Sequence, residues 1–131
     1  MLIEIDGARF EVELYDNAAV RDLLNSLPQR ISMSRWGDEF YGTLARKVNH
    51  AGVPLRDVFE VGEIAFWPPG NALCIFFGPT PASRDGEPRM ASPGVALGKL
   101  KGDPSVFKSH GSSLQNVRLL RCTSSDAGKD L

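Results

Sequence analysis

The segment Arg35–Tyr41 (RWGDEFY) brings charged and aromatic residues together at close spacing. Asp38 and Glu39 could form a pair of carboxylates for general acid–base catalysis. Adjacent residues of a strand point to opposite faces, however, so the two carboxylates are not expected to meet. We therefore interpret Asp38 as a turn residue rather than as an acid catalyst.

Other residue types that support catalysis lack the spacing that catalysis needs. His50 and His110 are the two histidines of the chain, and neither lies in an HxH, HxxxH or HExxH pattern. Metal sites are usually built from clustered ligands, so no metal site is expected. No phosphate-binding glycine loop, dinucleotide fingerprint or GxSxG motif occurs, and no motif pairs Cys74 with a histidine. We expect no cofactor, and neither covalent nor metal-assisted chemistry.

The segment Phe66–Pro81 (FWPPGNALCIFFGPTP) is the strongest aromatic signal in the chain. A turn rich in proline and glycine precedes the apolar run Ala72–Phe77, which predicts a hairpin with one strand covered on both faces. Successive side chains of a strand alternate between its faces. One of Phe76 and Phe77 should therefore pack in the core, while the other can reach the wall of a pocket.

Length and charge place the chain among ordinary globular proteins. It has 131 residues, with 15 Lys and Arg against 16 Asp and Glu. This balance argues against nucleic acid as a partner. The first residues are acidic where a signal peptide would be basic, and no apolar run approaches the roughly 20 residues that span a bilayer. We expect a cytoplasmic protein that does not associate with membranes.

Periodicity predicts many short strands and one helix. Alternating apolar residues around Asp6-Gly7 predict a hairpin over residues 2–15. A helix of about ten residues should follow and end before Pro28. Further strands are expected at 31–34, 58–61, 64–67, 72–77, 95–100 and 116–122, with a long loop at 82–94. This pattern favours one β-barrel domain over residues 1–122, closed or nearly closed, with a disordered tail at 123–131.

Three segments in order resemble cyclophilins, namely residues 8–24, 62–77 and 95–102. The chain is still more similar to a family of small bacterial and archaeal cyclophilin-like proteins. That family carries a WGDE-Y segment, matched by residues 36–41, and a VGDIAYWPPGNALCIFFGPTPxS segment, matched by residues 61–83 with Glu and Phe in place of one Asp and one Tyr. The resemblance covers residues 1–122 and implies a closed eight-stranded barrel with one principal helix.

Cyclophilins isomerise X-Pro bonds without a nucleophile, by placing an arginine against the prolyl amide beside an apolar pocket. The resemblance puts Arg35 in the catalytic position, with Phe40, Tyr41 and Phe77 as the proline pocket. Thr43 stands where the family has a glutamine, and residues 82–94 contain no match for the cyclophilin tryptophan and histidine. Arg35 could equally be a surface cation stacked on an aromatic ring.

Three hypotheses follow for an otherwise uncharacterised protein. The first is a module that binds a small molecule or a proline-containing peptide in an aromatic cleft near Trp36, Phe40, Tyr41, Phe66, Trp67 and Phe77. The second is a peptidyl-prolyl cis-trans isomerase that uses Arg35. The third is a homo-oligomer or protein-interaction module, in which an exposed aromatic patch forms the interface.

Overall fold

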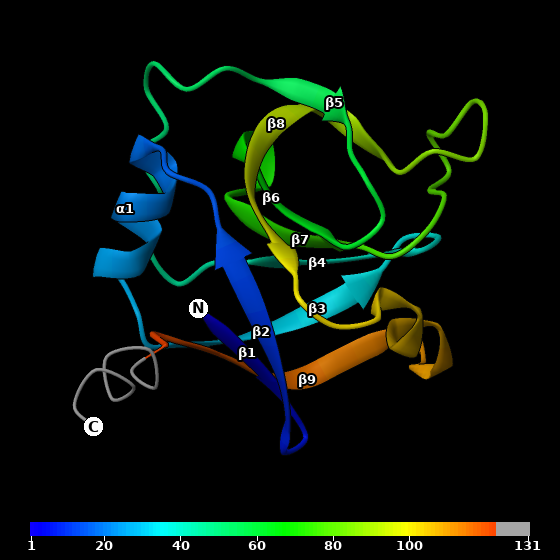
Figure 1. Cartoon of the computed structure of the whole chain (residues 1–131), viewed down its shortest axis with the longest axis horizontal. Coiled ribbons are helices and arrows are strands. Elements are labelled where there is room, and N and C mark those ends of the chain that lie inside the picture. The colour runs from blue at the N-terminus through cyan, green and yellow to red at the C-terminus, as the bar shows by residue number, and fades with distance from the viewer. Residues whose placement is uncertain (123–131) are drawn as a thin grey trace.

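The computed structural model describes residues 1–122 of the chain, and the tail expected to be disordered, 123–131, lies outside the described residues. Strands dominate (Figure 1). The strands are β1 (Leu2–Ile5), β2 (Ala8–Leu14), β3 (Gln29–Arg35), β4 (Glu39–Thr43), β5 (Arg56–Val58), β6 (Glu63–Trp67), β7 (Ala72–Phe76), β8 (Arg89–Leu100) and β9 (Ser113–Leu120). The helices are α1 (Ala18–Asn25) and two short 3₁₀ helices, η1 (Pro68–Gly70) and η2 (Pro104–Ser109).

Local sequence explains the first hairpin and the helix that follows it. Asp6 and Gly7 both have positive φ, 50° and 86°, which is the backbone that a two-residue hairpin turn between β1 and β2 requires. Asn17 then caps α1, because its side chain accepts a hydrogen bond of 2.9 Å from the backbone N–H of Val20. Val20 and Leu23 are buried on the inner face of the helix. The predicted hairpin and helix are confirmed.

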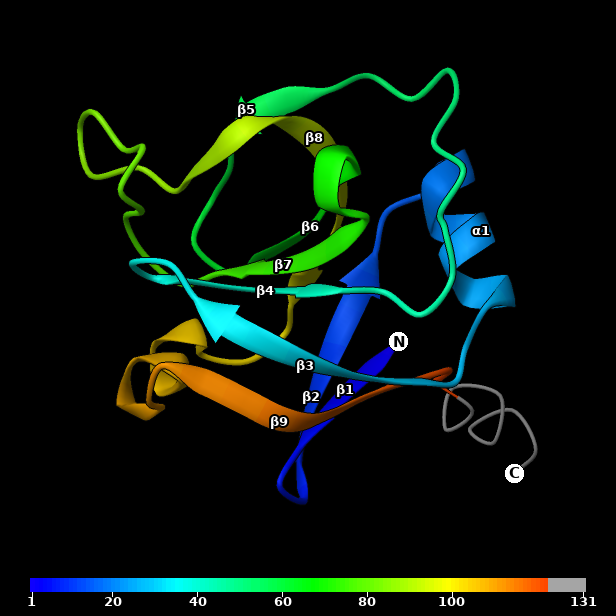
Figure 2. The same ribbon diagram turned by 180° about the vertical axis from the view of Figure 1, so that it is seen from behind.

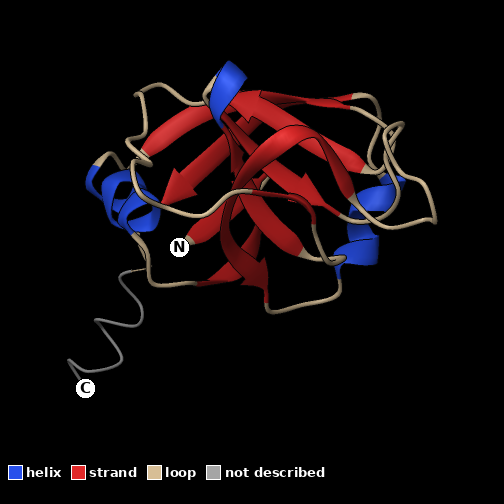
Figure 3. Cartoon of the chain, turned by 90° about the horizontal axis from the view of Figure 1, so that it is seen from above, coloured by secondary structure: helices blue, strands red, loops and turns tan. Residues whose placement is uncertain are grey.

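Antiparallel pairing arranges the strands in the order β2-β1-β9-β3-β4-β7-β6-β8-β5. A further pairing of β2 with β8, from Val12–Leu100 to Leu14–Gly98, joins two strands that are far apart in this order. The result is a ring of strands, with β5 added beside β8 (Figures 1 and 2). Seen from above, α1 and η2 lie at opposite sides of the strands (Figure 3). The mainly β fold with one principal helix is as predicted.

Two segments differ from the prediction. The strand expected at 58–61 lies at Arg56–Val58, and the second half of the expected loop at 82–94 belongs to β8. Both differences have one cause, because β5 and the start of β8 pair with each other over Val58–Arg89 and Arg56–Gly94. Such distant pairing leaves no periodic signal in a polar, glycine-rich segment. No helix in residues 1–122 is long and apolar enough to cross a membrane.

The two faces of the central strands have different roles. One face of β4, β7 and β6 packs into the main core, which contains Phe40, Leu73, Ile75, Ile64 and Phe66 together with apolar residues from most other elements. The opposite face carries a smaller apolar cluster of Phe59, Ala65, Cys74, Phe76 and Met90. We call these the inner and outer faces. Strand alternation assigns each residue of these strands to one of them.

Candidate functional site

A pocket of about 280 Å³ opens on the outer face. Four elements supply its walls: the β3–β4 turn, β4, the end of β6 and the start of β8. Its lining residues are Trp36, Glu39, Tyr41, Trp67, Met90 and Ala91. We call this the outer pocket.

The β3–β4 turn positions Trp36. Its backbone N–H donates to the carbonyl of Glu39 over 2.8 Å, and the Glu39 N–H donates back over 3.2 Å. Gly37 between them has a φ of +62°, a backbone conformation that residues other than glycine rarely adopt. A Cβ at Gly37 would also lie 2.8 Å from Pro81. The turn is therefore fixed both by its own hydrogen bonds and by the proline-rich segment that follows β7.

Glu39 is a buried acid on the pocket wall, with 4% of its surface exposed. Its Oε1 atom has no hydrogen-bond partner within the described part of the chain. Burial raises the pKa of Glu39 to about 7, and a hydrogen bond with the Cys74 thiol offsets only part of that rise. Desolvation also raises the pKa of Cys74, with the nearby Glu39 adding to the effect. Near neutral pH the thiol is therefore neutral, and Glu39 is divided between its neutral and charged forms.

Tyr41 and Trp67 form the aromatic sides of the outer pocket. Tyr41 lies opposite Cys74 in the β4–β7 ladder and is 39% exposed. The indole Nε1–H of Trp67 donates to Ser92 Oγ over 2.8 Å. A Cβ at Gly70 would lie 2.9 Å from the Trp67 ring, so the ring rests on this glycine. The end of β6, η1 and β8 thus hold one indole in place.

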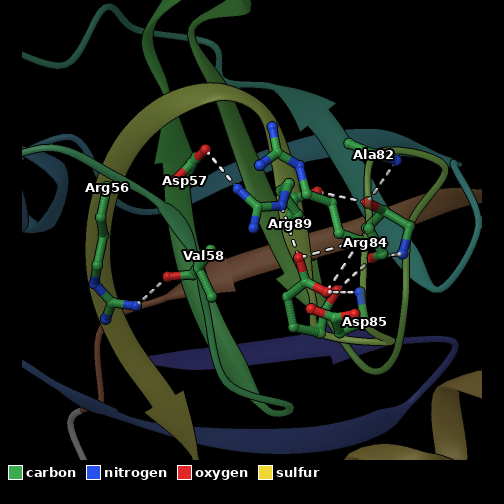
Figure 4. A network of polar contacts seen from close by, with 10 residues as sticks. Arg56, Asp57, Val58, Ala82, Arg84, Asp85 and Arg89 are labelled. Carbon is green, nitrogen blue, oxygen red and sulfur yellow. Dashed lines mark hydrogen bonds and ion pairs between the residues drawn. The ribbon is translucent and has the colours of Figure 1, made fainter.

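A polar network borders the pocket where β8 begins (Figure 4). Arg89, the residue before Met90, donates to Asp57 over 2.8 Å and to Glu87 over 2.7 Å. Glu87 also accepts backbone hydrogen bonds from Arg84 and Asp85 in the preceding loop. The Asp85 backbone bond, followed by the Arg89 bond, lowers the pKa of Glu87 to about 2. The arginine is thus paired with acids, and the network ties the loop to β5.

Arg35 lies in a different cluster, which closes one end of the main core. Its guanidinium carbon is 5.0 Å from the centre of the Phe77 ring and 5.9 Å from that of Phe40. The same group donates to the carbonyls of Gly37 and His110, over 2.8 Å each, and to Asp38 over 2.9 Å. Arg35 therefore holds the turn and the end of η2 together. Asp38 lies between β3 and β4, as its interpretation as a turn residue predicts.

Phe107 covers the two phenylalanines beneath Arg35. Its ring centre is 5.9 Å from that of Phe77 and 6.4 Å from that of Phe40, and all three side chains are at most 1% exposed. His110 stands edge-on to Phe40 at 6.3 Å. The surfaces that would hold a proline ring are thus occupied by the side chains of η2 and the residue after it.

The six aromatic residues predicted to share a cleft divide evenly between two places. The structure brings together Trp36, Tyr41 and Trp67 in the outer pocket. Phe40, Phe66 and Phe77 lie in the main core instead. Of the adjacent pair, Phe77 is the core residue, and Phe76 belongs to the outer cluster, where it stacks on Phe59 at 4.9 Å. Phe76 is itself fully buried and does not line the pocket.

Sequence reasoning missed Glu39, Met90 and Ala91 as lining residues and Phe107 as a cover. Glu39 could have been found, because it shares a strand face with Tyr41 two positions later. Met90 and Ala91 carried no usable signal in a segment predicted to be a loop. In the described residues no group of three or more His, Cys, Asp or Glu could hold a metal ion.

The family model described as cyclophilin-like matches residues 1–119, and the chain belongs to that family. The solved structures include a similar protein, the solution structure of the hypothetical protein AF2241 from Archaeoglobus fulgidus. It is 33% identical in sequence, with a TM-score of 0.71, and the match covers 92% of each chain. No curated protein matches the chain.

Proposed function

We propose that this cyclophilin-like protein binds a small molecule in the outer pocket. The observation that carries the proposal is the lining itself, in which three aromatic side chains surround a buried acid. Pockets for small molecules are mostly apolar with a few placed polar groups. A volume of about 280 Å³ lies just below the common range of about 300–1,000 Å³, which favours one or two fused rings over a peptide.

Both tryptophans of the chain, Trp36 and Trp67, line the outer pocket, so their indole N–H resonances report on it directly. A screen of small ring compounds by NMR should therefore shift these two signals first. Tyr41→Ala should weaken the hits about tenfold, as expected for the loss of one stacking ring. Val106→Ala is the control, because Val106 is similarly exposed, at 42%, but lies on η2. The proposal fails if no compound shifts the indole signals, or if both variants bind equally well.

A peptidyl-prolyl isomerase remains a second candidate, supported by the position of Arg35 over Phe77 and Phe40. This activity needs η2 to move, since Phe107 now covers both rings. A proline-peptide assay should then show acceleration that Arg35→Ala abolishes. A rate equal to the uncatalysed one would exclude the activity.

For the fold, we infer that the ring without β5 corresponds to the eight-stranded closed barrel that the resemblance implies.

A further inference from the structure

The wall of the outer pocket contains an acid without a counter-charge. Glu39 is 4% exposed, and its Oε1 atom has no partner within the described residues. Buried carboxylates are normally paired or hydrogen-bonded, because a buried charge without a partner is costly. Because Glu39 also lines the outer pocket, its carboxyl is the acidic group that a ligand in this apolar pocket would meet.

The cations nearest in sequence to the lining residues are bound elsewhere. Arg35, before Trp36, pairs with Asp38 and with backbone carbonyls. Arg89, before Met90, pairs with Asp57 and Glu87. No arginine, lysine or histidine of residues 1–122 forms an ion pair with Glu39. The protein thus leaves the positive partner of this acid to be supplied from outside.

The other titratable groups of the adjoining strands do not supply a positive charge. Cys74 on β7 is a buried thiol whose pKa is raised by burial and by Glu39 itself. On β6, Glu63 forms its own ion pair with Arg56. The remaining walls are the rings of Trp36, Tyr41 and Trp67, whose faces attract cations through their quadrupoles. Acid and aromatic walls therefore favour the same kind of ligand.

We infer that the outer pocket recognises a small organic cation, an amidinium or ammonium group on a flat apolar body, through an ion pair with Glu39 and stacking on the surrounding rings. This inference rests on the proposed function and specifies its ligand class. The amidinium or ammonium N–H groups donate to the Glu39 carboxylate, and the apolar body lies against the indole and phenol rings.

Binding of a cation should be coupled to the loss of a proton. With a pKa of about 7, roughly half of the Glu39 side chains are protonated at pH 7 in the free protein. A ligand that stays cationic throughout selects the carboxylate, and the proton of Glu39 passes to the buffer. Affinity should therefore rise with pH up to about 8, and a neutral ligand of the same shape should not follow this trend.

The test compares benzamidinium with benzamide, a neutral molecule of nearly the same shape, by NMR titration of the two indole signals. At pH 8 benzamidinium should bind about tenfold more tightly than benzamide. Glu39→Gln, which keeps the size of the side chain, should remove this preference while benzamide still binds. Glu11→Gln is the control for net charge, because Glu11 lies on β2 and is about half exposed. Calorimetry at pH 7, in two buffers of different ionisation enthalpy, should detect the release of about half a proton with benzamidinium alone.

The outcomes distinguish the cation inference from the proposed small-molecule binding on which it rests. If neither compound shifts the indole signals and the screen described above also gives no hit, both the binding function and the cation inference fall. If benzamide binds as tightly as benzamidinium, or if Glu39→Gln leaves the preference unchanged, the pocket binds small molecules but not as a cation site. Equal weakening by Glu11→Gln would likewise overturn the ion pair, since it would reduce the effect to the net charge of the protein.

Discussion

Glu39 and Glu63 are two buried acids that each begin a strand, β4 and β6, and their surroundings are opposite. Glu63, 1% exposed, receives hydrogen bonds from Arg56, from the Tyr15 hydroxyl at 2.8 Å and from the backbone of Glu60 at 2.8 Å. Glu39, 4% exposed, lines the outer pocket and has one oxygen without a hydrogen-bond partner in the described residues. We call the first arrangement the Glu63 network.

The pKa values of the two acids move in opposite directions for this reason. Burial disfavours the charged form of both acids, and by itself it would raise both pKa values. At Glu63 the bonds from Arg56, Glu60 and Tyr15 together outweigh burial, and the pKa falls below its ordinary value. At Glu39 only Cys74 opposes burial, and the pKa rises to about 7. Burial alone therefore does not distinguish an acid that stabilises the fold from one that is available to a ligand. The hydrogen-bond donors around the acid make that distinction.

The largest effect is expected from Glu63→Gln. This change removes the charge that Arg56 and Tyr15 face, so the free energy of unfolding should fall by about 2–3 kcal/mol at pH 7. Urea unfolding measures it. The matched control is Glu11→Gln, whose partner Lys101 is exposed, with an expected change of about 0.5 kcal/mol. Equal losses in the two variants would show that the Glu63 network contributes no more than a surface pair.

Glu39→Gln should have a smaller effect that changes sign with pH. Because the folded-state pKa lies above the ordinary value of 4.5, the native protein should lose stability as pH rises from about 4.5 to about 7. The variant lacks this loss, and we expect it to be about 1 kcal/mol more stable than the wild type at pH 8 but less stable at pH 5. Urea unfolding across this range is the measurement. A parallel pH dependence in both proteins would contradict the raised pKa.

The smallest effect is expected from two tyrosines of similar exposure, Tyr15 at 38% and Tyr41 at 39%. Burial, followed by the hydrogen bond to Glu63, raises the pKa of Tyr15 to about 12. Tyr15→Phe should lower the free energy of unfolding by about 1 kcal/mol, and Tyr41→Phe by less than about 0.5. Thermal unfolding gives both values. An ultraviolet titration of the wild type should contain a tyrosine ionisation near pH 12 that is absent in Tyr15→Phe.

Much of the fold could be predicted because its signals are local. The Asp6-Gly7 turn and the alternation within Ala72–Phe77 each depend on residues within a few positions. The β5–β8 pairing and η2 could not be predicted in the same way. Their positions depend on partners far along the chain, and their own residues are polar or irregular.

For the candidate site, the sequence predicts the aromatic strands but not which face of each strand points to the core. Alternation states that Phe76 and Phe77 point to opposite sides, but not which side is the core, and a shift of one residue would exchange them. The same choice separates Glu39 and Tyr41 from Phe40 between them. Only pairing with β7, which places Tyr41 opposite Cys74, settles it. The covering of the predicted proline pocket could not be predicted either, because no motif marks Phe107 as the residue that covers Phe40 and Phe77.

The closure of the ring by β2 and β8 leaves few strand edges unpaired. In the described part of the chain, β5 ends the strand order and is three residues long, with Arg56 and Asp57 among them. Long, flat and apolar edges invite other chains to add strands, whereas short and charged ones resist this. The architecture that presents the outer pocket thus also protects the protein against aggregation through its sheet.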